Sequence, residues 1–302
     1  MLDQTNFSNV SIVIPAKNEA KALIKLLPEL KQKFPDVEII IVNDGSTDNT
    51  TALCELNNVK EIQQPYSKGN GAAIKAGARL AQGEVLVFMD GDGQHQPDDI
   101  SRLLEKLNTG YDMVVGARDT KSQASYGRLV ANTVYNKLSS WVVDQKISDL
   151  TSGFRAVRAD KFRQFLYLLP NGFSYPTTST MAFFRAGLSV GYIPITALKR
   201  EGKSHINYFK DGMRFLLIIF KVASLYSPLK LFTPISMAFF LLGFSRYVYT
   251  YLESSTFTNM SALLFVTSVL IFLIGIVSEQ ITVLMYQRAS GERKSDREEE
   301  SE

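Results

Sequence analysis

Residues 84–95 read EVLVFMDGDGQH, a stretch that joins an apolar run to a short acidic turn. A short apolar run rich in Val and Phe predicts a buried β-strand, here over Glu84–Asp90. Asp90 and Asp92 then stand two residues apart at the carboxyl end of the strand, each followed by a glycine. Two carboxylates at this spacing suit Mg²⁺ or Mn²⁺, which prefer oxygen ligands. An acidic turn without a metal is the alternative.

The rest of the first two hundred residues repeats this alternation of apolar runs and amphipathic stretches. Such alternation predicts an α/β domain with a mostly parallel sheet. Ligands of open α/β sheets bind beyond the carboxyl ends of the strands, so polar residues after each run are candidates for a binding site. The other predicted strands are Val10–Pro15, Val37–Asn43 and Tyr111–Gly116; the predicted helices are Ser67–Gln82, Pro97–Asn108 and a pattern over Thr120–Ile147 whose apolar positions include Leu138 and Trp141.

Three further segments carry residues suited to a nucleotide. Asp44 follows the second strand in VNDGSTD, where its carboxylate can accept a hydrogen bond from a nucleobase imide or a ribose hydroxyl. After the first strand, IPAKNE (residues 14–19) offers a backbone edge for the base and Glu19 for the nucleoside. Lys68 precedes a glycine-rich helix start, where free N–H groups suit phosphate. An ordinary turn with a helix cap is the alternative at each place.

Charge and cysteine content narrow the classes of function. The chain has 302 residues, enough for about two structural units. With 33 basic and 30 acidic residues the net charge is +3, so we expect no nucleic-acid partner. The single cysteine, Cys54, excludes an intrachain disulfide and is expected to be buried. The first residues lack a basic region followed by an apolar run, so we expect no secretory signal.

The composition becomes strongly apolar after the first two hundred residues. Met213–Tyr226 is apolar but contains two basic residues and is too short to span a bilayer, which predicts an amphipathic helix at the membrane interface. Leu231–Leu252 and Met260–Leu284 have the length and composition of membrane-spanning helices. A soluble helical hairpin is the alternative for this pair.

Lysine and arginine flank the predicted hairpin but are absent from its connector, Glu253–Asn259. By the positive-inside rule we expect a multi-pass membrane protein with two spans, whose α/β domain and both termini are cytoplasmic. The last residues are polar and charged without an aromatic, which predicts disorder. The predicted organisation is an α/β domain over 1–208, an interfacial helix over 209–228, a membrane hairpin over 229–286 and a disordered cytoplasmic tail over 287–302.

Seven short motifs follow one another along the first part of the chain: IPAKNEA (14–20), VNDGSTDNT (42–50), KGNGAAIKAG (68–77), DGDGQHQPDDI (90–100), VVGAR (114–118), SDLTSGFRA (148–156) and KREGKSHI (199–206). In this order they resemble the family 2 glycosyltransferases, in particular the branch of dolichol-phosphate mannose synthases and bacterial polyprenyl-phosphate glucosyltransferases. The two apolar segments match a membrane-hairpin subgroup. The resemblance implies a Rossmann-like catalytic domain with the GT-A fold.

The resemblance also implies roles for individual residues. It assigns the nucleotide sugar to Pro15, Lys17, Glu19, Val42, Asp44, Lys68, Asp90, Gly91, Asp92 and Gln94, of which Asp90, Asp92 and Gln94 hold the Mg²⁺ or Mn²⁺ ion. It assigns catalysis to Asp92, Arg118 and Asp149, and the acceptor phosphate to Arg118, Arg128, Ser152, Arg200, Lys203 and His205. Relatives are expected to carry lysine where this chain has His205, which makes Lys203 a second candidate for that cation.

An enzyme of this branch would move a sugar from a UDP- or GDP-sugar to a polyprenyl phosphate, such as undecaprenyl or dolichyl phosphate, in the bilayer. The second pKa of a phosphate monoester is about 6, so the acceptor is ionised near neutral pH and needs little help from a base. We therefore expect catalysis by positioning and charge stabilisation, with inversion at the anomeric carbon. A hairpin anchor also permits a homo-oligomer.

Three other functions fit parts of the pattern. A family 2 enzyme that glycosylates a saccharide or another hydroxyl acceptor would need a base, for which Asp149 is a candidate. A nucleotidyltransferase with a similar α/β core would release pyrophosphate. A membrane scaffold with a degenerate nucleotide pocket is disfavoured because Asp90 and Asp92 are both present.

Overall fold

The computed structural model of the chain describes residues 9–118, 126–172, 174–197, 220, 224 and 226–299, with the backbone alone for 126–132, 134 and 286–299. The chain divides into two compact units. The first unit comprises residues 1–140 and 145–206, and the second comprises residues 141–144 and 207–302. Each unit is considered by itself below.

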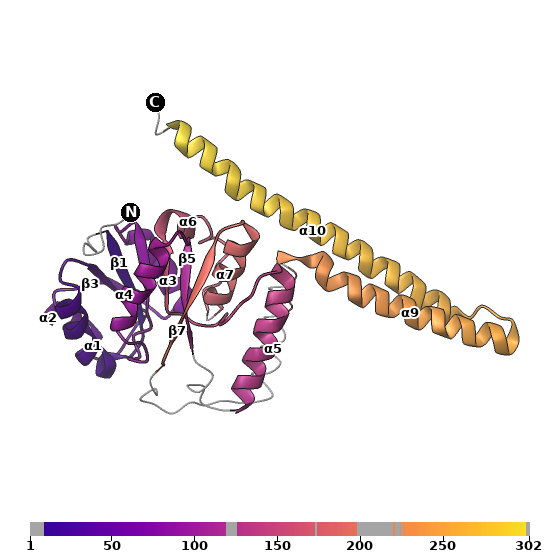
Figure 1. The fold of residues 1–302 in the computed structure, drawn as a ribbon, viewed down its shortest axis with the longest axis horizontal. Coiled ribbons are helices and arrows are strands. Elements are labelled where there is room, and N and C mark those ends of the chain that lie inside the picture. Colours follow the sequence, from indigo (N-terminus) through magenta and orange to yellow (C-terminus); the bar gives the residue numbers. More distant parts are fainter. Residues whose placement is uncertain are drawn as a thin grey trace. The chain divides into compact units, whose positions relative to one another are not determined.

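The first unit is built on a mixed sheet (Figure 1). Among the described residues this sheet has seven strands in the order β3-β2-β1-β4-β6-β5-β7. Strand β6 runs antiparallel to its neighbours β4 and β5, and all other neighbouring strands are parallel. The mostly parallel sheet confirms the predicted α/β class. The strands are β1 (Val10–Ala16), β2 (Glu38–Asn43), β3 (Lys60–Gln63), β4 (Val85–Phe88), β5 (Met113–Arg118), β6 (Arg155–Arg158) and β7 (Val190–Ile195).

Helices cover both faces of the sheet. Val10, Ile12 and Ile14 of β1 share a buried core with apolar residues of α1 and α4. The opposite face packs against α3, where a Cβ added to Gly77 would lie 2.3 Å from Cγ1 of Val13, so this glycine lets the helix approach the sheet closely. The helices of the first unit are α1 (Ala20–Lys33), α2 (Thr50–Leu56), α3 (Asn70–Leu80), α4 (Asp98–Asn108), α6 (Ala159–Arg163) and α7 (Tyr175–Arg185), together with most of α5 (Tyr126–Val143).

Strands β1, β2 and β4 bring three loops to one edge of the sheet. All residues of β4 and nearly all of β1 and β2 are buried, as expected of parallel strands covered on both faces. Since β1 pairs in parallel with both β2 and β4, the carboxyl ends of the three strands lie next to one another. The acidic and polar residues that follow these strands are therefore neighbours.

The boundaries differ from the sequence prediction at two places near this edge. Strand β4 ends at Phe88, so Met89 and Asp90 already belong to the turn. Helix α3 begins at Asn70 and not at Ser67, because residues 67–69 are held in an extended loop by Asp44. The predicted helix over Thr120–Ile147 corresponds to α5, of which the structure describes the part from Tyr126 onward.

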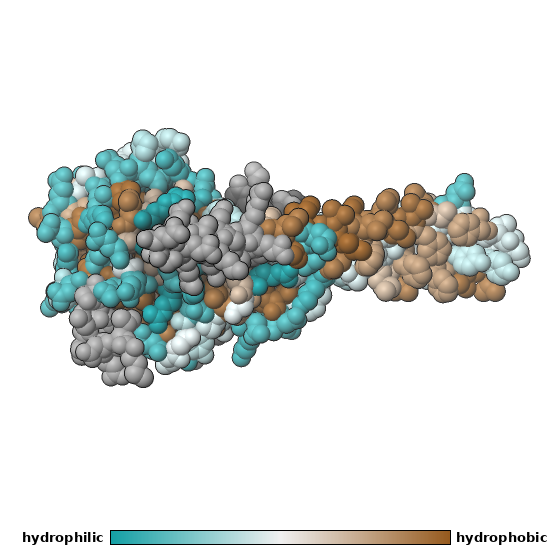
Figure 2. Space-filling view, turned by 90° about the horizontal axis from the view of Figure 1, so that it is seen from above, coloured by the Kyte–Doolittle hydropathy of each residue, from teal (hydrophilic) through white to brown (hydrophobic). Residues whose placement is uncertain are grey.

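The second unit contains helices α9 (Pro228–Ser254) and α10 (Asn259–Glu299), which lie side by side as a hairpin (Figure 1). Pro228–Ser254 and Asn259–Met285 are long and apolar enough to cross a membrane. Their apolar side chains are largely exposed, as Figure 2 also shows, whereas helices in the core of a soluble protein would bury them. This exposure favours the membrane hairpin over the soluble alternative.

Small residues form the seam between α9 and α10. Buried or closely packed small side chains recur every seven residues, which keeps them on one side of a helix. The Ser236 hydroxyl donates to the Ser268 carbonyl at 2.9 Å, and the Ser268 hydroxyl donates to the Ser236 carbonyl at 3.0 Å. The series is Ser236, Gly243 and Thr250 on α9, and Ser261, Ser268, Gly275 and Thr282 on α10.

The tail differs from its prediction. Residues 287–302 are expected from sequence to be disordered, but α10 remains helical to Glu299. Glu, Arg and Lys are good helix formers, so a charged segment that continues an existing helix needs no new nucleation. The predicted interfacial helix over 209–228 lies for the most part outside the described residues.

Candidate active site

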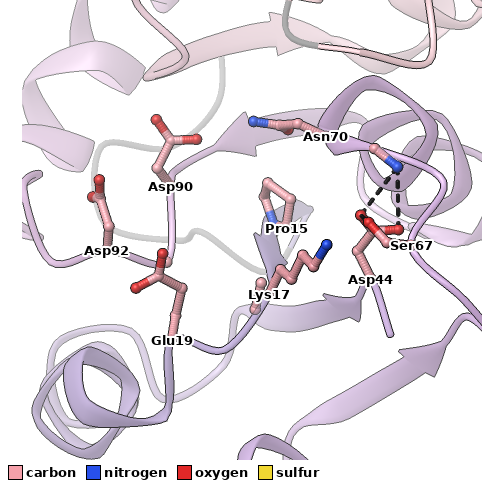
Figure 3. Close-up of a pocket in the computed structure, with 11 residues that line it drawn as sticks. Pro15, Lys17, Glu19, Asp44, Ser67, Asn70, Asp90 and Asp92 are labelled. Atoms are coloured by element: carbon pink, nitrogen blue, oxygen red, sulfur yellow. Dashed lines mark hydrogen bonds between the residues drawn. The ribbon is translucent and has the colours of Figure 1, made fainter. Parts of the chain in front are cut away.

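A cavity of about 460 Å³ opens at the carboxyl ends of β1, β2 and β4 (Figure 3). Asp90, Asp92 and Glu19 form its acidic end, and Asp44 and Ser67 lie at the other end, with Lys17 between them. The structure thus brings together residues from four separate segments of the sequence. The lining residues are Pro15, Ala16, Lys17, Glu19, Asp44, Ser67, Gly69, Asn70, Asp90, Gly91 and Asp92.

Two glycines shape the turn that carries the aspartates. A Cβ added to Gly91 would lie 3.3 Å from the Pro15 carbonyl oxygen, so a glycine here lets the turn pack against the end of β1. Gly93 has a φ of +74°, a left-handed conformation that glycine adopts without steric cost. The Gln94 N–H donates to Oδ1 of Asp92 at 3.1 Å, which fixes this carboxylate within the turn.

Asp90 is held by His95, which the sequence did not single out. Nε2 of His95 lies 3.5 Å from Oδ2 of Asp90, and the imidazole stacks on Phe154 with ring centroids 4.8 Å apart. Burial acts to raise the pKa of Asp90, but the hydrogen bond with His95, the charge of Arg118 and a hydrogen bond from Asn70 outweigh it, so this pKa lies below its usual value. Asp90 is therefore ionised at neutral pH.

The donor set fits a hard divalent cation that is completed by a substrate. Asp90 and Asp92 both line the cavity, and both are oxygen ligands. Within the part of the chain that the structure describes, no three His, Cys, Asp or Glu side chains are close enough to hold a metal ion on their own. Mg²⁺ commonly binds through one or two carboxylates together with substrate phosphates and water, so two aspartates suit an ion that arrives with a diphosphate.

Asp44 lines the cavity, and its carboxylate also fixes the loop before α3. Oδ2 accepts a hydrogen bond from the Ser67 hydroxyl at 2.7 Å, and Oδ1 accepts one from the Lys68 N–H at 2.6 Å. The Gly69 N–H lies 3.0 Å from Oδ2. Asp48 in the same motif accepts hydrogen bonds from the N–H groups of Ala20 and Thr50, the first residues of α1 and α2, at 2.9 and 3.2 Å.

The start of α3 does not offer the free N–H groups that the sequence suggested. The N–H groups of Gly71 and Ala72 donate to the carbonyls of Gly172 and Asn171, both at 3.1 Å. A Cβ added to Gly71 would lie 2.0 Å from the Pro170 carbonyl oxygen, so the glycine allows this close contact. Packing against residues 170–172 thus accounts for the glycine at position 71, while Gly69 and Asn70 of the same motif line the cavity.

Arg118 and Asp149 form a paired unit next to Asp90. Nε and Nη2 of Arg118 donate to the two carboxylate oxygens of Asp149 at 2.8 and 3.1 Å, and Nη2 also donates to the Thr151 hydroxyl. Burial acts to raise the pKa of Asp149, but the hydrogen bond and charge of Arg118 outweigh it and lower this pKa. Asp149 is thereby held as a carboxylate whose oxygens are engaged, which makes it a poor proton acceptor.

Arg155 and Tyr175 hold the loop after Asp149 in place through hydrogen bonds. Arg155 is fully buried and, among the described residues, forms no ion pair with a carboxylate. Its guanidinium donates to the carbonyls of Ser152 and Pro176 and to the Ser179 hydroxyl. The Tyr175 hydroxyl donates to the Gly153 carbonyl at 3.1 Å. The Ser152–Gly153 segment is therefore held by both side chains.

The remaining predicted site residues are placed as follows. Val42 is buried inside β2 and does not line the cavity, and the Lys68 side chain lies over the Tyr66 ring at 5.5 Å. Ser152 is buried, and its hydroxyl has no hydrogen-bond partner among the described residues. Arg128 lies at the start of α5, in the stretch 126–132 of which the structure describes only the backbone. Arg200, Lys203 and His205 lie outside the described residues.

Residues 11–166 match the sequence profile of glycosyl transferase family 2, which is more than half of the chain, and residues 227–284 match the GtrB C-terminal hairpin. The chain belongs to glycosyl transferase family 2. It is a glycosyltransferase, and its hairpin indicates membrane association. The predicted family and the predicted class of enzyme are confirmed.

Several relatives of this glycosyltransferase have names that describe their reactions. The undecaprenyl-phosphate mannosyltransferase of Micrococcus luteus is 32% identical over 64% of this chain and 84% of its own length. The polyprenol monophosphomannose synthase of Mycolicibacterium smegmatis is 32% identical over 70% of this chain and 84% of its own length.

Among solved structures, glucosyl-3-phosphoglycerate synthase from Mycobacterium tuberculosis, in complex with Mn²⁺, uridine diphosphate and glucosyl-3-phosphoglycerate, is similar to this glycosyltransferase with a TM-score of 0.57. The two sequences are 17% identical, and the similarity covers 71% of this chain and 78% of the synthase. At this identity the similarity establishes the GT-A fold alone.

Proposed function

We propose that this glycosyltransferase moves a sugar from a nucleotide-sugar donor to a polyprenyl phosphate at a membrane, with Mg²⁺ or Mn²⁺. The observation that supports this most is the pair Asp90 and Asp92 in a cavity of about 460 Å³, beside the paired Arg118. Of the two relatives at 32% identity, one is named for undecaprenyl phosphate and the other for polyprenol monophosphomannose. The hairpin would hold the chain in the bilayer that contains such lipids.

Each residue of the site has a part in this proposal. Asp44 and Lys17 would face the nucleoside end of the cavity, while Asp90 and Asp92 would hold the cation. A divalent ion bound there would neutralise charge on the diphosphate leaving group. The guanidinium of Arg118, fixed by Asp149, is suited to a phosphate oxygen because its fork of N–H groups matches that geometry.

Asp149 acts in this proposal by positioning Arg118 and not as a base. A saccharide or other hydroxyl acceptor would need a carboxylate free to take a proton. Both oxygens of Asp149 accept from Arg118, and Oδ1 also accepts from the Thr151 N–H at 3.0 Å. An ionised phosphate acceptor needs no such base, so the engaged carboxylate favours the lipid phosphate. Direct attack by that phosphate would invert the anomeric carbon.

The test is the Asp92→Asn variant of the full chain, with undecaprenyl phosphate and a panel of UDP- and GDP-sugars. We expect transfer to fall by about 100-fold or more, because one ligand of the charge-neutralising ion is lost. Binding of Mn²⁺ in the presence of nucleoside diphosphate, followed by electron paramagnetic resonance, should weaken in parallel.

Asp98→Asn is the matched control for this experiment. Asp98 lies on α4 with a side chain that is 74% exposed and paired with Lys33. It should keep wild-type transfer and Mn²⁺ binding. Undiminished transfer by Asp92→Asn, or transfer by the wild type to hydroxyl acceptors alone, would contradict the proposal.

The predicted site residues whose side chains the structure does not describe keep their roles as proposals. Arg128, Arg200, Lys203 and His205 would contact the acceptor phosphate. The interfacial helix over 209–228, the cytoplasmic position of the catalytic domain and termini, and a homo-oligomer likewise remain predictions.

A further inference from the structure

Trp141 is the single tryptophan of the chain and lies in the last turn of α5. The sequence pattern places it on the apolar side of this helix, yet 47% of its surface is exposed. A lone exposed apolar side chain is common and needs no explanation by itself. The surroundings of Trp141 make this one different.

Residues 141–144 are fixed to the first turn of α9 within the second unit. Nζ of Lys230 donates to the Trp141 carbonyl at 3.3 Å and forms an ion pair with Asp144. The Ser227 hydroxyl donates to the Val142 carbonyl, also at 3.3 Å. Ser227 is buried, so residues 141–144 are packed against the start of α9. Trp141 is therefore held beside the point at which α9 begins.

The position of α9 then determines what lies next to Trp141. Helix α9 begins at Pro228 and is long and apolar enough to cross a membrane. The first turn of such a helix lies at the membrane surface. Tryptophan is enriched at this level of membrane proteins, because its ring is apolar and its indole N–H seeks a polar partner.

Lysines accompany the tryptophan at this junction. Lys137 lies one helical turn before Trp141 on α5 and is exposed, and Lys146 follows α5 and is exposed as well. The only carboxylate described between them, Asp144, is paired with Lys230. Unpaired lysines near a bilayer surface are attracted to anionic headgroups. The local charge therefore suits an anionic surface, and the start of a helix long enough to cross a membrane beside Trp141 favours lipid over an acidic protein partner.

We propose that Trp141 inserts its ring into the boundary between headgroups and acyl chains of the bilayer that α9 enters, with Lys137 and Lys146 against anionic headgroups. The end of α5 is then a second membrane contact in addition to the hairpin. This inference requires that α9 crosses the membrane, but it does not depend on the sugar or on the acceptor of the reaction.

The experiment uses the fluorescence of the full wild-type chain, which reports on Trp141 alone. The protein is reconstituted into vesicles of phosphatidylcholine and phosphatidylglycerol whose acyl chains are brominated either near the headgroup or near the bilayer centre. Trp141 should be quenched more by the shallow bromines than by the deep ones. It should be shielded from iodide in the aqueous phase.

Two double variants, in which Trp141→Phe is combined with a tryptophan elsewhere, calibrate the measurement. Leu241→Trp places the indole at an exposed position in the middle of α9 and should be quenched most by the deep bromines. Leu56→Trp places it at a residue of α2 that is 81% exposed and should be quenched by iodide alone.

Quenching of Trp141 by iodide as strong as that of Leu56→Trp, with no effect of brominated lipid, would overturn the proposal even if Leu241→Trp reports a membrane helix. Failure of the bromines to quench Leu241→Trp would show that α9 does not enter the bilayer, and this would overturn the proposal as well. Sugar transfer by the same vesicles is measured separately, so neither result is confused with failure of the proposed reaction.

Discussion

Gly153 is the residue at which the loop after Asp149 meets Asp90. A Cβ added to this glycine would lie 3.0 Å from Oδ2 of Asp90 and 3.1 Å from the Tyr175 hydroxyl. Both neighbours are fixed, Asp90 by His95 and Tyr175 by its burial. The absence of a side chain at this position therefore leaves room for the Asp90 carboxylate in this orientation.

Gly153→Ala should lower sugar transfer by about 10- to 100-fold, because even a small displacement of a catalytic group is costly. The measurement is the rate of transfer at saturating donor, with circular dichroism to show that the fold is kept. Gly172→Ala is the control, since a Cβ there would have no atom within 4 Å. Equal rates for the two variants would show that the space beside Asp90 is unimportant.

The sequence predicted those site residues that follow apolar strands. Asp44, Asp90 and Asp92 were found because parallel strands end at one edge, and the cavity does contain all three. His95 was missed although it lies in the same motif, since its contact with Asp90 depends on the stacking against Phe154. The pairing of Arg118 with Asp149 joins residues 31 positions apart and has no local signal.

At the scale of elements, the hairpin shows how small residues let two apolar helices approach each other closely. In lipid, burial of apolar surface gives little advantage, so close packing and hydroxyl bonds hold helices together. The heptad series of Ser, Gly and Thr places such residues along the whole seam. A Cβ added to Gly275 would lie 2.8 Å from Cβ of Phe232, the tightest of the contacts at the hairpin glycines.

Gly275→Leu should separate α9 from α10 at this point, since the seam has no room for the added carbons. The measurement is oxidation of a Ser236→Cys/Ser268→Cys pair, whose hydroxyls lie 3.2 Å apart in the wild type. The added Gly275→Leu change should slow formation of this disulfide, whereas Val277→Leu, at a position 58% exposed, should not. A disulfide that forms equally fast in both would mean that the seam does not depend on glycine.

Among the described strands, the sequence prediction missed β3, β6 and β7, of which β3 and β6 lack an apolar run and β7 has its run interrupted by Gly191 and Pro194. Strand β6 reads RAVR, four residues of which two are charged, so it lacks the apolar run that predicts a strand. Its place between β4 and β5 is decided by pairing with both of them. By contrast β1, β2, β4 and β5 were found within two residues at each end, because their β-branched cores are buried on both faces.

At the scale of the whole molecule, the orientation in the membrane remains to be tested, and Cys54 makes the test simple. This lone thiol is buried, and burial raises its pKa to about 12, so the reactive thiolate is scarce near neutral pH. The wild-type chain should therefore react only slightly with a maleimide, so that labelling reports on an introduced cysteine.

In intact cells a membrane-impermeant maleimide should label Thr256→Cys, an exposed position in the connector of the hairpin. It should not label Ser295→Cys in the tail until the cells are opened, because the positive-inside rule places the tail in the cytoplasm. Labelling of the tail in intact cells would reverse the predicted orientation.

The insertion of β6 between β4 and β5 has a consequence for biosynthesis. Strands β1, β2, β3 and β4 can pair with one another as soon as the ribosome has released them, but β5 has only β6 and β7 as neighbours in the sheet. Arg118, at the end of β5, pairs with Asp149, and β5 joins the rest of the sheet through β6, so this arginine is placed only after residue 158 has emerged. Helix α9 begins later in the chain, at Pro228, so the arginine can take its place before the hairpin reaches the insertion machinery.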